Sequence, residues 1–501
     1  MVDFGYDISN FYDIQPEYGT MKDLEELISK AKSLGLKLIL DFVPNHSSDE
    51  CEWFKKSAER DPDYDDYYIW HPGKPNPDGG RNLPPTNWVS VFYGSAWTYH
   101  PVRQEYYLHQ FTKQQPDFNY RSEKLRNQMK DVLRFWLDKG VDGFRVDAIP
   151  HLVEGQDSNG EFVDEPVVGQ DPLDYGYTLK TQTKDHPMTY TMVYEWREVL
   201  DQHQKEHGGD TRVMMTEAYT DVDHTMEYFG NGSQIGAHIP FNFFLISDLK
   251  LESNARDFKT SIDKWLDNLP SGKTSNWVLG NHDQKRLASR LGEERLDGIN
   301  MMLKLLPGAS VTYQGEELGL TDVFLTWEQT KDPQACNAGK DHYLEKSRDP
   351  ARTPMQWDAT VSSGFSTSEN TWLPLAPDYK DNNLEKQKAS TKSHYKVYKA
   401  LSPLRQLEVV KYGSYDLKVL NENVLAFTRN LYGYNSIVVV LNFGPKPENV
   451  PLRSYFANLS ERSKVKLSSI NSERNIGDTV MTEDVALSSY EALVLEDWPI
   501  Y

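Results

Sequence analysis

Three carboxylic acids stand on short motifs, each at the end of a separate apolar segment. Asp147 closes residues 143–147 (Gly-Phe-Arg-Val-Asp), Glu217 follows Met-Met-Thr, and Asp283 ends Asn-His-Asp. One such acid could simply cap a loop or pair with an arginine, because a buried charge needs a partner. Three of them at successive strand ends favour a shared site. Acids that converge on one point suit glycosyl transfer, in which one carboxylate attacks and another carboxyl group protonates the leaving oxygen.

The residues beside two of these acids suggest different roles. Arg145 precedes Asp147 by two positions and shares its strand face, so its charge favours the ionised, nucleophilic form of that acid. Glu217 has no cation adjacent in the sequence. We therefore expect Glu217 to be the acid that stays protonated, helped by partial burial and the like charge of its neighbours.

The segments that carry these acids alternate between helix and strand. Apolar residues at helical spacing, followed by Gly or a polar break and a short apolar run, recur along nearly 400 residues. This pattern predicts a parallel sheet, with helices over 20–34, 123–139, 195–207, 255–268 and 295–305 and strands over 36–43, 141–149, 212–218, 276–283 and 309–316. Chemistry-bearing residues gather at the strands' far ends, as in a (β/α)8 TIM barrel. An open doubly wound sheet is the alternative, but the Gly-rich phosphate turn typical of it does not follow a first strand.

Two stretches depart from the alternation. Residues 47–122 are rich in Pro, Tyr and Trp and read as a loop-rich insertion, and short strands with hairpin-like turns follow from about residue 410. We expect barrel over 1–46, an inserted domain over 47–122, barrel again over 123–408, and an antiparallel β domain over 409–501.

Composition excludes several classes of function. The 501 residues carry a formal net charge of −21, which repels phosphate backbones and anionic lipids, so we expect no nucleic-acid partner. The sequence contains no run of 18 apolar residues, so we expect no transmembrane segment in this chain, and the first residues lack the pattern of a signal peptide. Cys51 and Cys336 are interpreted as two separate thiols, with a single long-range disulfide as the alternative.

The motifs together resemble the α-amylase family of glycoside hydrolases (family 13), in its insect-type maltase or α-glucosidase branch. The family's blocks are similar to residues 41–46 (Asp-Phe-Val-Pro-Asn-His), 143–147, 217–218 and 281–283, and residues 115–119 (Gln-Pro-Asp-Phe-Asn) match the α-glucosidase form of a fifth block. Several blocks in the right order are a specific signal, whereas any one alone is weak. The resemblance covers essentially the whole chain.

The resemblance implies roles for the acids and their neighbours. Asp147 would be the nucleophile, Glu217 the general acid and base, and Asp283 the residue that stabilises the oxocarbenium-like state. His46 and His282 would hold sugar hydroxyls, and Arg145 would orient Asp147.

A second motif of the branch implies a closed pocket. Asp3 would accept bonds from sugar hydroxyls and Tyr6 would stack on the ring, while an arginine would pair with Asp3; Arg352 is our choice and Arg348 its competitor. A closed end implies a retaining, exo-acting α-1,4-glucosidase that acts on maltose and short α-glucosides, with sucrose as a further candidate. The alternatives are a non-catalytic or dual-role binding protein of the transporter heavy-chain or gut-receptor type, and a transglycosylase or sucrose isomerase.

The resemblance implies no cofactor for the chemistry, but a structural calcium ion is an open alternative. Asn45 and Asp117 match calcium-binding positions of many members, and Glu154 could supply a third oxygen; bracing of loops without a metal is the equal alternative. Because the similarity starts inside the family's barrel, we expect the barrel's first strands, and any signal peptide, to be missing from this chain. By resemblance the protein is a secreted or membrane-face glycoprotein, with sequons at Asn231 and Asn458.

Overall fold

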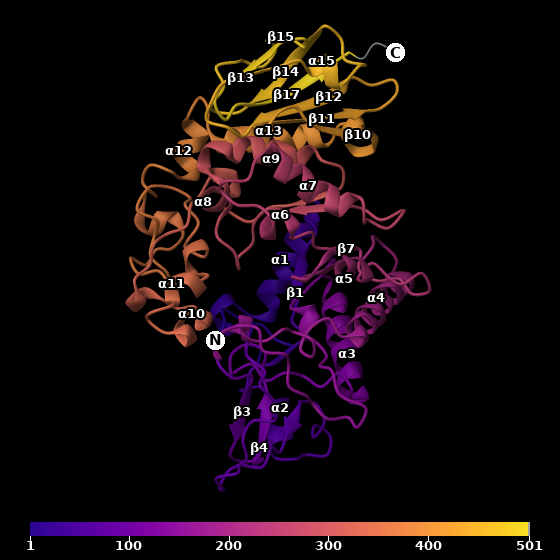
Figure 1. Ribbon diagram of the computed structural model, residues 1–501, viewed down its shortest axis with the longest axis vertical. Helices are drawn as coiled ribbons and strands as arrows, with labels where there is room; N and C mark the ends of the chain where they lie inside the picture. The colour runs from indigo at the N-terminus through magenta and orange to yellow at the C-terminus, as the bar shows by residue number, and fades with distance from the viewer. Residues whose placement is uncertain (499–501) are drawn as a thin grey trace. The chain divides into compact units, whose positions relative to one another are not determined.

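The computed structural model describes residues 1–498, and Figure 1 follows them in colour from the N-terminus to the C-terminal sheet. The chain forms two compact units. The first comprises residues 1–241, 270–273 and 331–347, and the second comprises 242–269, 274–330 and 348 onward. The last three residues of the domain that we expected over 409–501 lie outside the described part.

A four-stranded parallel sheet forms the centre of the first unit. Its strands lie in the order β1 (Ile39–Phe42), β5 (Gly143–Val146), β6 (Val213–Thr216) and β7 (Ile239–Pro240). The helices of this unit are α1 (Met21–Ser33), α2 (Glu52–Ala58), α3 (Glu123–Lys139), α4 (Pro187–His207), α5 (Val222–Glu227), α10 (Pro333–Ala338) and α11 (Tyr343–Lys346). Parallel strands need such crossover helices, so the alternation expected from the sequence is present.

Local signals in the sequence set the ends of the helices. Thr20 caps α1 through a reciprocal capping box with Asp23, and the Ser122 hydroxyl accepts the Leu125 N–H at the start of α3. Helix α3 ends at Gly140, which has φ of 99°, a conformation that glycine adopts without a steric penalty. Each strand therefore starts within a few residues of a helix end.

Residues 47–122 contain a small antiparallel sheet of their own. Its strands lie in the order β2 (Trp70–His71), β4 (Glu105–Leu108) and β3 (Trp97–His100). The aromatic side chains of this region pack mainly on one another: Trp88 and Trp97, both buried, stack with ring centroids 5.6 Å apart. Packing of the insertion therefore accounts for these two rings.

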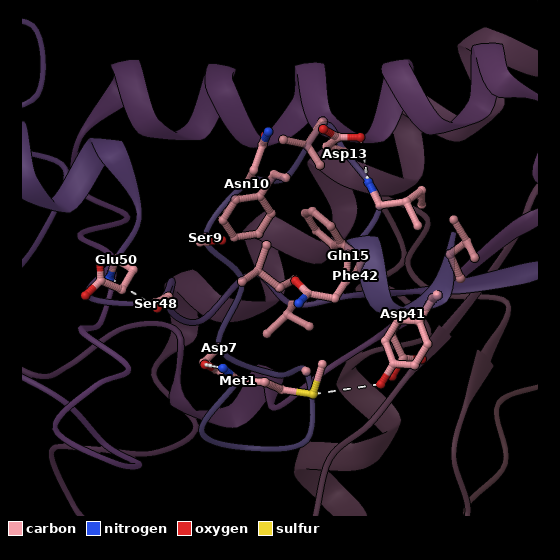
Figure 2. A pocket seen from close by; sticks show the side chains of 18 of the residues that line it. Met1, Asp7, Ser9, Asn10, Asp13, Gln15, Asp41, Phe42, Ser48 and Glu50 are labelled. Carbon is pink, nitrogen blue, oxygen red and sulfur yellow. Dashed lines mark hydrogen bonds and ion pairs between the residues drawn. The ribbon is translucent and has the colours of Figure 1, made fainter. Parts of the chain in front are cut away.

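The outer strand of the parallel sheet borders a cavity. Within residues 1–498, β1 is paired on one side only, with β5. Leu40, Phe42 and most of residues 1–18 line the cavity, and Figure 2 shows Phe42 and Asp41 there with Gln15 and Met1.

The second unit holds a parallel pair of strands and a larger antiparallel sheet. The parallel pair is β8 (Asn276–Val278) and β9 (Ala309–Val311). The antiparallel sheet has the order β10 (Ser414–Val419), β11 (Val424–Asn430), β12 (Ser436–Asn442), β17 (Ala492–Asp497), β14 (Arg462–Ser468) and β15 (Thr479–Met481), and β13 (Glu448–Val450) pairs with β16 (Val485–Leu487). Its helices are α6 (Phe244–Ser247), α7 (Ala255–Leu266), α8 (Leu287–Leu291), α9 (Leu296–Leu305), α12 (Leu384–Ala389), α13 (His394–Arg405), α14 (Glu408–Tyr412) and α15 (Leu452–Tyr455). The expected C-terminal antiparallel domain is confirmed.

The main differences from the expected elements concern length. Every expected strand is present but shorter: β1, β5 and β6 lack residues at both ends, whereas β8 and β9 lack only their last ones. Helix α4 begins eight residues before the expected start at Glu195. Strand β7 was missed, since two residues are too few to show periodicity. Among residues 1–498, the helices are either too short or too polar to cross a membrane.

Candidate active site

The pairing of β5 with β6 brings Asp147 and Glu217 to the same edge of the first unit's sheet. Val146 lies opposite Thr216 in the parallel register, so the two acids follow at equivalent positions. The strands approach closely because residue 143 is glycine: a Cβ atom there would lie 2.1 Å from the backbone oxygen of Val213. Asp147 is 8% exposed and Glu217 7%.

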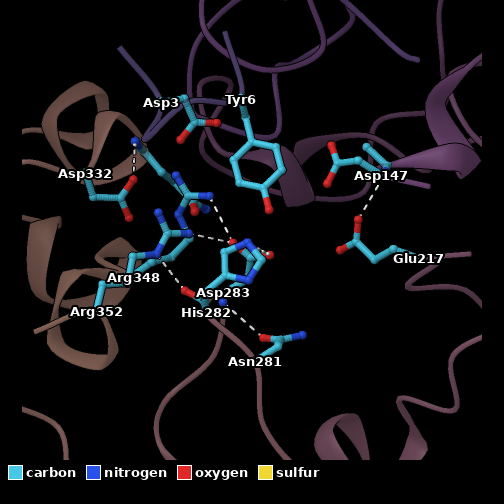
Figure 3. A network of polar contacts seen from close by, with 12 residues as sticks. Asp3, Tyr6, Asp147, Glu217, Asn281, His282, Asp283, Asp332, Arg348 and Arg352 are labelled. Carbon is cyan, nitrogen blue, oxygen red and sulfur yellow. Dashed lines mark hydrogen bonds and ion pairs between the residues drawn. The ribbon is translucent and has the colours of Figure 1, made fainter. Parts of the chain in front are cut away.

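One guanidinium group joins the two acids. Arg145 Nη1 donates to Asp147 Oδ1 in a short hydrogen bond, and its Nη2 lies 3.1 Å from Glu217 Oε2. The same Nη1 is 3.3 Å from Oδ2 of Asp41 on β1. Figure 3 shows Asp147 and Glu217 facing each other at the ends of their strands. The expected partnership of Arg145 with Asp147 is present.

The surroundings of Glu217 differ from the sequence-based expectation. We expected no cation beside Glu217, yet Arg145 contacts it, because Arg145 pairs in register with Met215, two residues before Glu217 on the neighbouring strand. The Ala148 N–H also donates to Glu217 Oε2 at 2.8 Å. Both contacts engage Oε2, and neither involves Oε1.

A second group of residues lies beside this pair in the same unit. The Tyr6 hydroxyl donates to Asp41 Oδ2 at 2.5 Å, and the Tyr6 carbonyl oxygen accepts from His46 Nε2 at 2.9 Å. Gln115 is fully buried, and its Nε2 donates to Asp3 Oδ2 at 3.1 Å and contacts His46 Nε2 at 3.0 Å. The structure thus brings the N-terminal motif against the strand ends.

Burial and charge set the protonation of three of these groups. Burial lowers the pKa of His46 to about 4, although its bond to the Tyr6 carbonyl acts in the opposite direction, so the ring is neutral at pH 7. Burial raises the pKa of Tyr6 well above its usual value. Burial alone would lower the pKa of Arg145, but the carboxylates of Glu217 and Asp147 raise it overall, and the guanidinium stays charged.

The third acid belongs to the second unit. Asp283 follows β8, and its Oδ1 accepts from Arg352 Nη2 at 2.7 Å and from Arg348 Nη1 at 3.1 Å. Arg352 Nε also donates to the carbonyl oxygen of His282 at 2.6 Å, and Asn281 Oδ1 accepts the Asp283 N–H at 3.0 Å. Figure 3 shows both arginines directed at Asp283. Both candidate arginines therefore share one carboxylate oxygen, and the pairing of Arg352 with Asp3 stays a prediction.

The three candidate calcium ligands are buried together in the first unit. Asn45, Asp117 and Glu154 are each 1% exposed, and Asn45 Nδ2 donates to Asp117 Oδ1 at 3.1 Å. One oxygen of each has no hydrogen-bond partner within residues 1–498: Asn45 Oδ1, Asp117 Oδ2 and Glu154 Oε2. Burial raises the pKa of Asp117 well above its usual value, with the charge of Glu154 as a further cause, and burial raises the pKa of Glu154 to about 7. Unpartnered oxygens of this kind fit a hard cation.

Asp41 and Gln115 belong to the site although no role was expected for them, and the two cysteines bear on the disulfide alternative. Asp41 and Gln115 lie in blocks that the sequence analysis quoted but received no role there; the position of Asp41 at a strand end was a signal for it, whereas the contacts of Gln115 are visible only in the fold. Cys51 is buried and Cys336 exposed, and neither forms a disulfide, so the long-range bridge is wrong.

Comparison with known proteins agrees with this geometry. Residues 1–413 match the family model described as alpha amylase, catalytic domain. The chain is 48% identical over 501 residues to Maltase A1 of Drosophila melanogaster, covering 99% of this chain and 87% of that protein. It is 49% identical over 471 residues to the salivary alpha-glucosidase of Aedes aegypti, covering 94% and 81%. A solved structure of the trehalulose synthase MutB from Pseudomonas mesoacidophila superposes with a TM-score of 0.81 at 28% identity, covering 99% of this chain and 89% of that one.

These matches confirm the expected (β/α)8 fold class, of which six parallel strands are described here in the two units. They also confirm the resemblance to insect maltases, since the similarity extends over nearly the whole sequence. The chain therefore belongs to the alpha-amylase family of glycoside hydrolases.

Proposed function

We propose that this protein is a retaining, exo-acting α-1,4-glucosidase that releases glucose from maltose and short α-glucosides. The observation that carries the proposal is the pair of buried carboxyl groups, Asp147 and Glu217, held at adjacent strand ends by one arginine. Retaining enzymes need two acids close together with different protonation. Relatives named maltase and alpha-glucosidase, at nearly half identity, support the choice of substrate.

The contacts of the two acids suggest how they divide the work. Asp147, bonded to Arg145, attacks the anomeric carbon as a carboxylate, and the bond from that carbon to the leaving oxygen breaks. Glu217 donates its proton from Oε1 to that oxygen. Glu217 then takes a proton from water, the resulting hydroxide attacks the anomeric carbon, and Asp147 is released.

The other site residues keep, in this proposal, the roles that the family resemblance implies. Asp283, held by Arg348 and Arg352, would stabilise positive charge on the sugar ring in the transition state, with His282 binding hydroxyls beside it. Asp3 and Tyr6 would bind the non-reducing glucose, with His46 behind them. A pocket closed in this way accepts a chain end and no interior segment, which accounts for exo action.

The buried oxygens of Asn45, Asp117 and Glu154 support a structural calcium ion. Calcium would supply no chemistry to the reaction; it would hold the loop after β1 against residues 110–117. We retain the domain boundaries of the sequence analysis, since a separate antiparallel sheet occupies 47–122 and another follows residue 409. The salivary relatives support a secreted protein.

Variants of the proposed nucleophile test the mechanism. Asp147→Gly should lose at least about three orders of magnitude in turnover of 4-nitrophenyl α-glucoside, and sodium azide should restore turnover with β-glucosyl azide as product. Asp131→Asn, an exposed aspartate on α3, is the matched control. Proton NMR of the wild-type reaction should detect α-glucose first. Initial release of β-glucose, or azide without effect on Asp147→Gly, would reject the retaining assignment.

A sucrose isomerase is the second candidate, favoured by the similarity of the fold to a trehalulose synthase. The two activities require the same acids and differ in whether water or the released sugar attacks the glucosyl intermediate. On sucrose, hydrolysis yields glucose and fructose in equal amounts, whereas an isomerase yields a new disaccharide. Chromatography of the products decides between them.

A further inference from the structure

A cluster of two histidines and an aspartate lies outside the proposed active site. Asp138 is in the last turn of α3, and His203 and His207 are four residues apart in the last turns of α4. These two helices pack side by side in the first unit (Figure 1). One candidate ligand atom from each of the three residues lies within 4.8 Å of the other two. Residues four apart on a helix face the same side, so the spacing of the histidines is suited to chelation.

The contact between the two helices already has the dimensions of a metal site. His203 Nε2 donates a hydrogen bond to Asp138 Oδ1 at 3.2 Å, and a bound ion would take the place of that proton. Two ligand atoms on a tetrahedral zinc ion lie about 3.3 Å apart when each bond is about 2.0–2.1 Å long. The rings of His203 and His207 are nearly parallel, with centroids 4.2 Å apart. An ion cannot lie in the plane of two parallel rings, but His207 is exposed, so its side chain has room to turn toward an ion between His203 and Asp138 in exchange for its hydrogen bond to the His203 carbonyl oxygen.

In the absence of an ion, a hydrogen bond fixes the tautomer of His207. Its Nδ1 donates to the backbone carbonyl oxygen of His203 at 3.0 Å, and because a carbonyl only accepts, the proton must be on Nδ1. The lone pair is therefore on Nε2, which is the arrangement found in metal-binding histidines.

His203 contributes the buried side of the cluster. It is 7% exposed, and its Nδ1 has no hydrogen-bond partner within residues 1–498. Arg212 is the nearby positive charge that would oppose a bound cation, but its guanidinium is engaged by the backbone carbonyls of Gly208 and Asp210.

We propose that Asp138, His203 and His207 form a binding site for a divalent transition metal, zinc in the first place, with water as the fourth ligand. Imidazole nitrogens select such ions over calcium and magnesium, which prefer oxygen. An ion there links the end of α3 to the end of α4. The site is distinct from the calcium position and supplies nothing to glycosyl transfer.

Titration of the full-length, chelator-treated protein with ZnCl2 alone tests the site, with excess calcium present to fill the other position. Calorimetry should detect one zinc ion per chain, and Co2+ should give visible absorption typical of nitrogen ligation. His207→Gln and Asp138→Asn should each weaken zinc binding at least about tenfold, since removal even of an outer-shell partner costs about 10–100-fold. The matched control is His342→Gln, another exposed histidine, which should bind as the parent does.

Zinc should also raise the melting temperature of the parent and of His342→Gln, and raise it far less in His207→Gln. Equal zinc affinity in the parent and in His207→Gln would overturn the proposal, and so would binding that Asp138→Asn leaves unchanged. Turnover of α-glucosides is not part of the readout, so failure of this site would leave the proposed function untouched.

Discussion

The buried carboxyl group of Glu154 gives a prediction whose size follows from the structure. Burial raises its pKa from 4.5 to about 7. Between these values the folded state holds a proton that the unfolded state has lost, so the free energy of unfolding decreases as pH rises. A pKa difference of about 2.5 corresponds to about 3 kcal/mol, all of it lost above pH 7. In Glu154→Gln this loss should be absent, because the amide does not ionise.

The difference between the two proteins should be measured by urea unfolding at pH 4.5 and pH 8, in EGTA. Comparing the change in stability between the two pH values cancels the constant cost of burying an amide NH2 group and the titration of groups remote from Glu154. The charge of Glu154 also raises the pKa of Asp117, so Asp117 adds to the difference in the same direction. We expect the parent to lose about 3 kcal/mol relative to Glu154→Gln over this interval. Glu198→Gln, an exposed glutamate on α4, is the matched control and should follow the parent.

Calcium supplies the second half of the test. A cation bound by Asp117 and Glu154 favours their ionised forms, so calcium at pH 8 should restore most of the parent's lost stability and should restore much less in Glu154→Gln. The reasoning is refuted if the parent and Glu154→Gln have the same dependence on pH in EGTA. A parent that calcium does not stabilise at pH 8 would reject the calcium site.

Three further predictions concern the active-site edge and the buried histidines. Arg145→Met should reduce kcat by at least about two orders of magnitude, because two buried carboxyl groups lose their shared cation. The control is Arg134→Met, which changes an exposed arginine on α3, and kcat of both variants is measured with 4-nitrophenyl α-glucoside. Gly143→Ala should prevent soluble expression or abolish activity, since its Cβ would overlap the Val213 carbonyl oxygen at 2.1 Å. A Gly143→Ala protein that is folded by circular dichroism and active on the substrate would contradict this. Below pH 6.5 the histidines of the unfolded state bind protons, whereas the buried histidines of the folded state stay neutral until about pH 4. The free energy of unfolding should therefore decrease between pH 6.5 and 4, in Glu154→Gln as well as in the parent, by about 3 kcal/mol for each ring whose pKa is about 4, such as that of His46. Thermal unfolding across this range measures the decrease, and a stability that does not change with pH would contradict it.

The sequence was sufficient for the elements whose signals are local. Helix α1 begins at its Thr20 cap and α3 ends at Gly140 because side-chain capping and a left-handed glycine act within a few residues. The acids Asp147 and Glu217 could be placed at strand ends because each directly follows an apolar run. The resemblance to the family's motifs then added roles for these acids, which hydrophobic periodicity cannot assign.

Contacts that depend on the register of paired strands could not be predicted from the sequence. Arg145 contacts Glu217 because β5 and β6 are neighbours in a particular alignment, and nothing local to either residue encodes that pairing. The two-residue strand β7 is defined by its partner β6, and the buried role of Gln115 is defined by Asp3 and His46. In each case the information lies between segments far apart in the chain.

The charge balance at the edge of the first unit's sheet connects these contacts to the proposed reaction. The Arg145 guanidinium contacts three carboxyl groups there, those of Asp41, Asp147 and Glu217. His46 adds no positive charge at pH 7, because burial keeps its pKa at about 4. Asp41 is exposed, so water screens its charge, whereas the carboxyl groups of Asp147 and Glu217 are both buried beside the Arg145 guanidinium. Two buried carboxyl groups aimed at one point are suited to a transition state in which the sugar ring becomes positively charged, so this arrangement would favour the oxocarbenium-like species in the proposed reaction.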